Sequence, residues 1–140
     1  PKAAHIFVGL QIREAEKVSA LVRTLRANGY ATLDMTDNEM AKLHIRHLVG
    51  GRAPNAHDEI LYRFAFPERP GALMNFLNKM GGGWNISLFH YRSHGADFGR
   101  VLVGMQVPVK DKKKFRKFLD SLGYEYVEET NNPAYKLFLS

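Results

Sequence analysis

The chain has 140 residues and a formal net charge of +6, and 45% of its residues are hydrophobic. A chain of this length forms one domain or two very small ones, with enough apolar residues for a buried core. It has no cysteine, which excludes disulfides, thiolate metal sites and a cysteine nucleophile and fits a reducing compartment. An apolar run of about 18 residues and a secretory leader are both missing, so we expect neither a membrane span nor export.

The first 36 residues predict a strand, a helix and a second strand. The segment 6–12, IFVGLQI, is an apolar run of the length of a strand. Val18, Leu21, Val22 and Leu25 then follow at the i, i+3, i+4, i+7 spacing of a helix with one apolar face.

Residues 37–58 are predicted to form a linker helix and a loop. Thr36 and Glu39 have the spacing of a capping box, which predicts that a helix starts there. This helix is expected to continue to about Leu48 and to end at the glycines that follow. The segment 52–58 has the composition of a linker.

Residues 59–128 predict the element order βαββαβ. Apolar residues alternate over 60–66, which is the period-2 pattern of a strand. Over 73–80 they recur at helical spacing, and the glycines at 81–83 end that helix. This order is typical of a ferredoxin-like α+β fold, and the tail 134–140 is expected to add a short strand. The remaining predicted elements are strands at 86–92 and 100–107, a helix at 112–122 and a strand at 124–128.

The chain contains an internal duplication. The segment 6–12, IFVGLQI, matches 101–107, VLVGMQV, and the two glycines are 95 positions apart. Residues 36–38 match residues 130–132 at an offset of 94. We therefore expect two copies of one structural unit along the chain.

The first copy is expected to be incomplete. The second copy has a strand, a helix and a strand before VLVGMQV, and their counterparts would fall before residue 1. Residues 1–36 are therefore predicted to be the C-terminal half (βαβ) of a first unit, 37–58 a linker, and 59–140 a complete second unit. Unpaired strand edges recruit other strands. We expect either a homo-oligomer in which another chain fills the empty position, or docking of the half-unit on the complete one.

The junction between the first strand and first helix of the complete unit is the candidate binding site. Gly71 and Ala72 add little bulk, so that a ligand can approach the backbone closely. Pro70 suits a first helical position, and the exposed N–H groups there can hold a carboxylate. Asn85 offers a donor and an acceptor to a neighbouring amino group, while nearby apolar side chains would select an aliphatic ligand. The alternative is a well-formed turn without a ligand. The candidate residues are Pro67, Glu68, Arg69, Pro70, Gly71, Ala72, Leu73 and Asn85.

Tyr91 is a further candidate on the predicted strand 86–92. It is either a core aromatic residue or a residue whose hydroxyl group faces a ligand. His90 and Arg92 are expected at the surface or at an interface rather than in catalysis. Strict alternation places Ile86, Leu88 and His90 on one face and Ser87, Phe89 and Tyr91 on the other.

Catalytic and metal sites are not indicated by the sequence. It has no nucleophile elbow, no phosphate-binding loop and no carboxylate cluster with metal-ligand spacing. His44 and His47 are three positions apart, but no third ligand is suggested, and we expect both at the surface. The basic run at 110–114 is expected to be a solvated helix start rather than a nucleic-acid patch.

Several strings resemble a known family over essentially the whole chain. They are DNEMAKLH at 37–44, FPERPGAL at 66–73, WNISLFHYRSHGADFGRVL at 84–102 and ETNNPA at 129–134. Together they resemble the C-terminal regulatory region of biosynthetic threonine dehydratase (threonine deaminase), which is similar to a tandem of two ACT-like domains. The resemblance implies an ACT-like βαββαβ fold for the second unit and half of an ACT-like domain before it.

The resemblance also implies a function. It suggests an allosteric module that binds isoleucine as inhibitor and valine as its antagonist, in an enzyme that converts threonine to 2-oxobutanoate and ammonia. Tyr91 matches an effector-contacting tyrosine of that family, and the 67–73 loop and Asn85 match the ACT ligand loop. The pyridoxal phosphate of such enzymes belongs to a catalytic domain that this chain lacks, so we expect no cofactor and no catalysis here. The cytoplasm is the expected location, or a plastid for a plant enzyme.

Two other function classes are weighed against this one. RNA-recognition modules share the βαββαβ order, but they need stacking aromatic residues on the third strand. The third predicted strand, at 101–105, has none. A stand-alone enzyme on this fold would need an acid–base or nucleophile set, which the sequence does not offer. We therefore expect no nucleic-acid partner.

Overall fold

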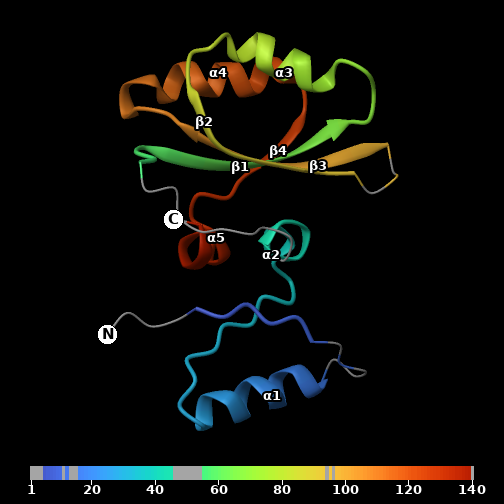
Figure 1. Ribbon diagram of the computed structural model, residues 1–140, viewed down its shortest axis with the longest axis vertical. Coiled ribbons are helices and arrows are strands. Elements are labelled where there is room, and N and C mark those ends of the chain that lie inside the picture. Colours follow the sequence, from blue (N-terminus) through green and yellow to red (C-terminus); the bar gives the residue numbers. More distant parts are fainter. Residues whose placement is uncertain are drawn as a thin grey trace.

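The computed structural model describes residues 5–10, 12, 16–45, 55–93, 95 and 97–139. Within them, helices and strands follow one another in the order shown in Figure 1. No helix in this described part is long and apolar enough to cross a membrane. The elements are α1 (Glu16–Ala27), α2 (Glu39–Leu43), β1 (Glu59–Pro67), α3 (Ala72–Met80), β2 (Asn85–Arg92), β3 (Phe98–Gln106), the 3-10 helix η2 (Val109–Asp111), α4 (Lys112–Leu122), β4 (Glu125–Glu128) and α5 (Pro133–Phe138).

The four strands form one antiparallel sheet, which confirms the predicted α+β class. Their order is β2-β3-β1-β4, so β1 lies between β3 and β4. Helices α3 and α4 cover one face of the sheet, and the short helices α2 and α5 lie on the other (Figure 1). The loop between β1 and α3 therefore lies at one end of the sheet.

The larger core lies between the sheet and helices α3 and α4. Alternate residues of β1 point into it, as the period-2 pattern predicted, and Phe64 is 1% exposed. The rings of Phe64 and Phe76 lie 5.5 Å apart between their centroids in an edge-on arrangement, which is a favourable geometry for aromatic pairs. The glycine stop of α3 is confirmed, because Gly81 caps the helix in a left-handed conformation (φ 60°).

A second, smaller core fills the opposite face of the sheet. Leu61 of β1 and Leu102 of β3 are fully buried there. They are covered by Met40 of α2 and Tyr135 of α5. Both faces of the sheet are therefore covered, and residues from the first part of the chain help to cover one of them.

The two strands predicted in the half-unit do not form. Residues 5–10 and 30–35 have no regular secondary structure, and neither segment belongs to a strand among the described residues. A strand needs a neighbouring ladder, and the counterparts of β1 and β2, which flank β3, do not occur in the described first part. Helix α1 forms as its spacing predicted.

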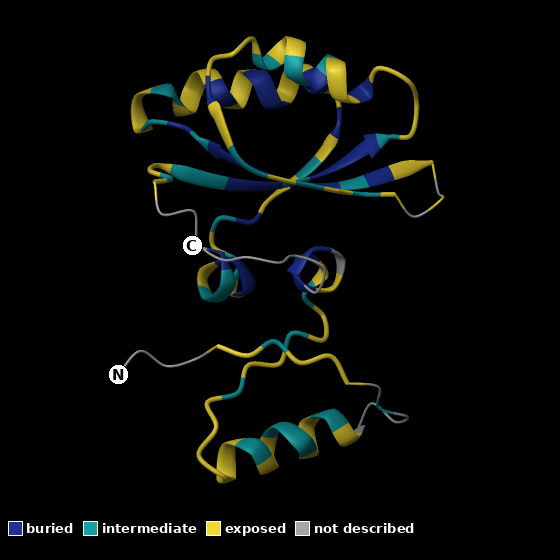
Figure 2. Ribbon diagram, in the orientation of Figure 1, coloured by how far each residue is buried: buried dark blue, intermediate teal, exposed yellow. Residues whose placement is uncertain are grey.

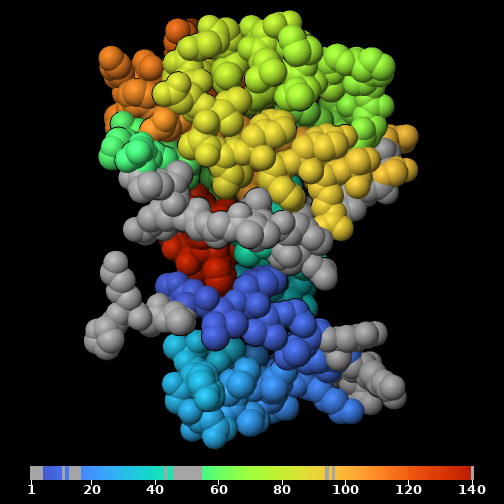
Figure 3. Space-filling view, viewed as in Figure 1, coloured from blue at the N-terminus to red at the C-terminus, as the bar shows by residue number. Residues whose placement is uncertain are grey.

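The unpaired segment 5–10 exposes the side chains that its copy buries. Ile6, Val8 and Leu10 are 79%, 62% and 62% exposed, whereas the matching Val101, Val103 and Met105 of β3 are 0% exposed. Figure 2 shows this contrast between the two parts of the chain. The other side of the segment packs on α5, because the ring centroids of Phe7 and Phe138 lie 5.8 Å apart. In Figure 3 this first part (blue to cyan) meets the red side chains of α5.

Helix α2 begins later than the predicted capping box. Asn38, not Thr36, is its N-cap, and the Asn38 side chain accepts a hydrogen bond from the Ala41 N–H. The helix ends at Leu43 with His44 as its C-cap, so the predicted continuation is wrong at His44 and Ile45, and residues 46–48 lie outside the described residues.

The C-terminal tail forms a helix, so the predicted last strand is wrong. Asn132 caps α5 by accepting a hydrogen bond from the Ala134 N–H at 2.9 Å, and Pro133 occupies the first turn. A capping residue followed by proline starts a helix, and this local signal outweighs the loose alternation of the tail.

A β-bulge changes the predicted faces of β2. The register shifts between Ile86 and Leu88, so that Ile86 pairs with Met105 and Leu88 with Gly104. Ile86 therefore lies on the same face as Tyr91 rather than on that of Leu88. Because β2 is an edge strand, neither of its faces is fully buried.

Candidate functional site

The β1–α3 loop turns through a left-handed glycine before α3 begins. Gly71 is the N-cap of α3 at φ 88°, a conformation in which side chains are strained. The helix therefore begins at Ala72, and Pro70 lies before the cap rather than at the predicted first helical position. The N-cap makes no side-chain hydrogen bond to the first turn. The Ala72 N–H donates to the Arg69 carbonyl at 3.3 Å.

Most of the predicted loop residues lie at the surface. Ala72 is buried in the larger core, while Glu68, Arg69 and Gly71 are exposed. Leu73, expected on the buried face of α3, is 45% exposed. Leu73 belongs to the first turn of α3, and its exposed apolar side chain is available to a bound molecule.

The structure brings Tyr91 to this loop. The Tyr91 hydroxyl donates a hydrogen bond of 2.5 Å to Glu68 Oε1. The same contact with the Glu68 carboxylate, followed by burial and by the carboxylate charge, raises the pKa of Tyr91. The Glu68 N–H donates to the Asp97 carbonyl at 2.8 Å, which ties the loop to the start of β3. Tyr91 is thus not a core residue, and its hydroxyl is part of the loop surface.

The predicted grouping of Asn85 with the loop is wrong. Asn85 pairs with Gln106 at one end of the sheet, whereas Pro67 pairs with Phe98 at the other. The strand direction explains the separation, because β2 runs from Asn85 towards the loop and reaches it only at Tyr91. Asn85 instead lines a cavity of about 310 Å³ together with Trp84 and other residues.

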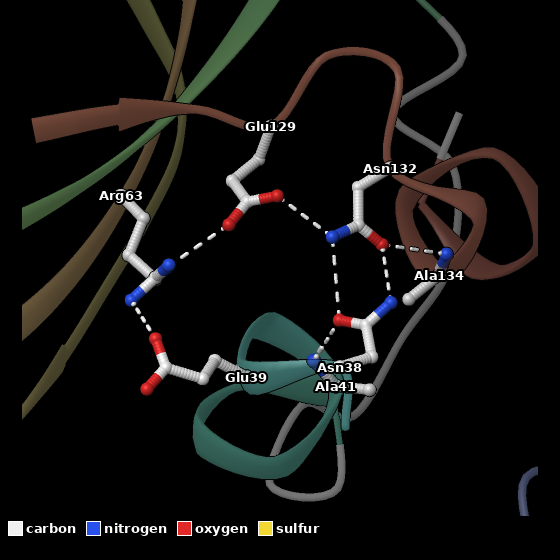
Figure 4. Close-up of polar contacts among 7 residues, drawn as sticks. All are labelled: Asn38, Glu39, Ala41, Arg63, Glu129, Asn132 and Ala134. Carbon is white, nitrogen blue, oxygen red and sulfur yellow. Dashed lines mark hydrogen bonds and ion pairs between the residues drawn. The ribbon is translucent and has the colours of Figure 1, made fainter. Parts of the chain in front are cut away.

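A second polar constellation, which the sequence analysis missed, joins the two parts of the chain (Figure 4). Arg63 of β1 bonds to Glu39 of α2 at 2.6 Å and to Glu129 at 2.9 Å. Glu129 is only 8% exposed, and the Arg63 guanidinium group compensates its charge in this partly buried position. These groups line an open cavity of about 580 Å³.

Asn38 and Asn132 form a reciprocal pair at the same place. Each amide nitrogen donates to the other side-chain oxygen, at 2.8 and 3.2 Å, and each asparagine also caps its own helix. The residues are 94 positions apart, which is the offset of the duplication. The repeat in the sequence therefore indicated that Asn38 and Asn132 are equivalent positions, but it could not indicate that the two residues are in contact.

A histidine pair forms another contact between the two parts. His44, expected at the surface, is fully buried, and its Nδ1 lies 2.7 Å from Nδ1 of His90 on β2. Burial, followed by the nearby Arg92 charge, lowers the pKa of His90. The predicted partner position His47 lies outside the described residues. In the described part of the chain, no group of three or more potential ligands is placed to hold a metal.

The structure argues against the RNA-recognition alternative. Such modules stack bases on the sheet face that lies away from their two helices. Here that face is covered by α2 and α5, and its residues Leu61 and Leu102 are fully buried. A strand of nucleic acid would have to displace both helices to reach the sheet.

Comparisons with known proteins agree on one family. A family model described as the C-terminal regulatory domain of threonine dehydratase matches residues 50–139. The chain is 56% identical over 139 residues to the L-threonine dehydratase biosynthetic IlvA of Burkholderia multivorans, and 49% identical over 140 residues to that of Escherichia coli. It is 46% identical over 140 residues to the mitochondrial threonine dehydratase of Saccharomyces cerevisiae. These alignments cover 99% of the chain but 27%, 27% and 24% of the relatives, so the chain spans about a quarter of their length. The chain belongs to the family of C-terminal regulatory domains of biosynthetic threonine dehydratase.

Proposed function

We propose that this chain is an allosteric module that binds a branched-chain amino acid, isoleucine as inhibitor and valine as its antagonist, at the β1–α3 loop. The proposal rests on the contact between Tyr91 and Glu68, which joins the loop to β2. The uncapped first turn of α3 suits the ligand carboxylate. The exposed Leu73 is placed to contact an aliphatic side chain. The binding residues are therefore those of the loop and Tyr91, without Asn85.

The division of the chain supports a regulatory role. We propose that 59–140 is a complete ACT-like domain of the ferredoxin-like type, that 1–36 is half of a first one, and that 37–58 links them. An effector that binds one arrangement of these parts more tightly shifts the population towards it. Such a shift would change the contacts of Arg63 and of the Asn38–Asn132 pair, which connect the two parts of the chain.

The exposed face of residues 5–10 supports a proposal about assembly. Ile6, Val8 and Leu10 match core positions of β3 but are exposed. A partner strand placed beside them would supply a hydrogen-bonded ladder, and an apolar face of the same partner could cover them. We propose that the chain forms homo-oligomers in which a partner strand completes the half-unit.

Catalysis is proposed to belong to the remainder of the enzyme. We infer that the whole protein is a pyridoxal-phosphate-dependent threonine ammonia-lyase of isoleucine biosynthesis, and that it resides in the cytoplasm or in an organelle. Such a cofactor is held as a Schiff base on a lysine.

Isothermal titration of the chain with isoleucine tests the proposal. We expect saturable binding that is weakened in Gly71→Ala, because the added side chain strains the left-handed N-cap by about 1–2 kcal/mol. Gly29→Ala is the matched control, since Gly29 is also left-handed (φ 84°) with open space around it but lies in the first part of the chain. Absence of binding by the unmodified chain, or equal weakening in both variants, would contradict the proposal.

A further inference from the structure

The hydroxyl of Tyr91 and the carboxylate of Glu68 meet above Gly99 of β3, beside the loop proposed to bind the effector. We propose that this Tyr91–Glu68 pair receives the ammonium group of the amino-acid ligand, and that Gly99 is the positioning residue that allows the pair to form. The inference rests on the proposed function, because it assigns the second charged end of a ligand whose carboxylate lies at α3.

The first argument is the space at Gly99. A Cβ atom at this position would lie 2.5 Å from Tyr91 Cε2, 2.8 Å from the Tyr91 hydroxyl oxygen and 2.9 Å from Glu68 Oε1. Distances this short force neighbouring atoms to move. Because Gly99 has no side chain, the Tyr91 ring can lie against the Gly99 backbone, and from there its hydroxyl reaches Glu68.

The second argument is the fixed position of the carboxylate. The Glu68 N–H is held by the Asp97 carbonyl at 2.8 Å, and its side chain is held by Tyr91 at 2.5 Å. Two independent contacts thus place one negative charge three residues before the N-cap Gly71. Glu68 is solvent-accessible, so that a ligand can reach it without any opening of the core.

The third argument is charge complementarity along the loop. The first turn of α3 favours an anion, and the Glu68 carboxylate favours a cation. A free amino acid carries both charges near neutral pH, so the loop matches both of its ends. On binding, the ammonium N–H groups donate to Glu68 and to the Tyr91 oxygen, and no covalent change is involved.

Asn85, the residue that the sequence suggested for this role, is too distant. Asn85 lies six positions before Tyr91 on β2, and at the rise of an extended strand this corresponds to about 20 Å. The side chains of Glu68 and Tyr91 are the groups of the loop surface that can replace it, since both present oxygen atoms to an ammonium group.

The test compares isoleucine with 3-methylpentanoate, which has the same carboxylate and side chain but no amino group. By titration calorimetry, the unmodified 140-residue chain is expected to prefer isoleucine by about tenfold or more, the scale of one charge-assisted hydrogen bond. In Glu68→Gln this preference is expected to fall severalfold, while the affinity for 3-methylpentanoate stays unchanged. Glu125→Gln removes an exposed carboxylate from the opposite edge strand and is expected to keep the preference.

Gly99→Ala tests the positioning role with a separate readout. The preference for isoleucine should fall as in Glu68→Gln, and the pKa of the Tyr91 phenol should return towards its ordinary value in an ultraviolet titration, with Tyr91→Phe identifying the signal. Gly9→Ala is the control, because a Cβ at Gly9 meets nothing within 4 Å.

The outcomes separate this inference from the proposed function. If the unmodified chain binds neither ligand, the proposed function fails. If it binds isoleucine but Glu68→Gln keeps the full preference over 3-methylpentanoate, the ammonium assignment is overturned while the proposed function stands. Glu68 is exposed, so this result does not depend on whether Gly99→Ala folds. An unchanged Tyr91 titration in a folded Gly99→Ala would overturn the positioning role alone.

Discussion

Single residues hold the two parts of the chain together, and two asparagines do so through both the oxygen and the nitrogen of their side-chain amides. In each of Asn38 and Asn132, the side-chain oxygen accepts from a helix N-terminus, while the amide nitrogen donates to the other asparagine. Each is therefore a cap and a bridge at once. The loss of one leaves the other with an unmatched donor.

The asparagine pair is expected to be energetically coupled. Asn132→Ala should lower the free energy of unfolding by about 1–2 kcal/mol, the usual cost of a lost N-cap. Asn38→Ala should cost a similar amount, and the double variant should cost less than the sum by at least about 0.5 kcal/mol, because the bridge is lost only once. Urea unfolding of the four proteins measures this. Asn131→Ala, at an exposed turn position, is the control, and strict additivity would show that the bridge contributes nothing.

The His44–His90 contact predicts a loss of stability in acid. At a separation of 2.7 Å, one Nδ1 must carry a proton and the other must accept it, so both cannot be protonated. The lowered pKa of His90 also predicts a loss of stability in acid, since in the folded state this pKa lies below its ordinary value of 6.5. Because the unfolded chain then binds more protons, this stability is present above pH 6.5 and decreases as the pH falls through the folded pKa. Of the charged groups nearby, Arg92 disfavours the protonated form further.

His90→Asn should remove that pH dependence while it keeps a neutral hydrogen-bonding group near the position of Nδ1. We expect the unmodified chain to lose more unfolding free energy than the variant between about pH 7.5 and about pH 5.5. The control is His57→Asn, which changes an exposed histidine. Parallel pH profiles for the unmodified chain and His90→Asn would contradict the assignment.

At the scale of elements, local patterns predicted the long elements and the short strand β4, but they gave the wrong bounds for α2 and the wrong type for α5. Helix α4 has the predicted bounds, because its apolar residues keep helical spacing until the left-handed Gly123 ends it. Helices α2 and α5 are short, and an isolated helix of this length is unstable. Their positions depend on the asparagine caps and on packing against Leu61 and Leu102, which no local pattern reports.

The candidate site shows the same division. The glycine turn before α3 was predictable, because its residues are local. The contact of Tyr91 with Glu68 depends on the register of β2, and the bulge between Ile86 and Leu88 alters that register. Asn85 was misplaced for a related reason, since alternation predicts the face of a residue but not its end of the sheet.

The smaller core is expected to support α2 and α5 together. Leu61→Ala should lower the free energy of unfolding by about 2–5 kcal/mol, because Leu61 is fully buried between β1 and both helices. Chemical denaturation measures the loss, with Leu33→Ala as the control, since Leu33 is 50% exposed and should change stability by less than about 0.5 kcal/mol. If Leu61→Ala lowered the free energy of unfolding as little as the control, the smaller core would not stabilise the two helices.

At the scale of the whole molecule, the first part of the chain has an exposed apolar face, formed by Ile6, Val8 and Leu10. That face predicts concentration-dependent self-association of the chain. Val8→Lys should shift the population towards the monomer, because a charge on an unpaired strand opposes strand addition. Light scattering coupled to size exclusion measures the mass, and Val109→Lys alters another exposed valine, 73% exposed against 62% for Val8, as control. A monomeric unmodified chain at every concentration would contradict strand completion.

Mapping the isoleucine site by amide chemical shifts is the most direct test of a regulatory module that senses an amino acid at its β1–α3 loop. Isoleucine is expected to shift the resonances of Glu68 to Leu73 and of Tyr91, and to leave those around Asn85 unchanged. Shifts confined to the cavity beside Asn85, to the cavity around Arg63, or absent from the whole chain would contradict it.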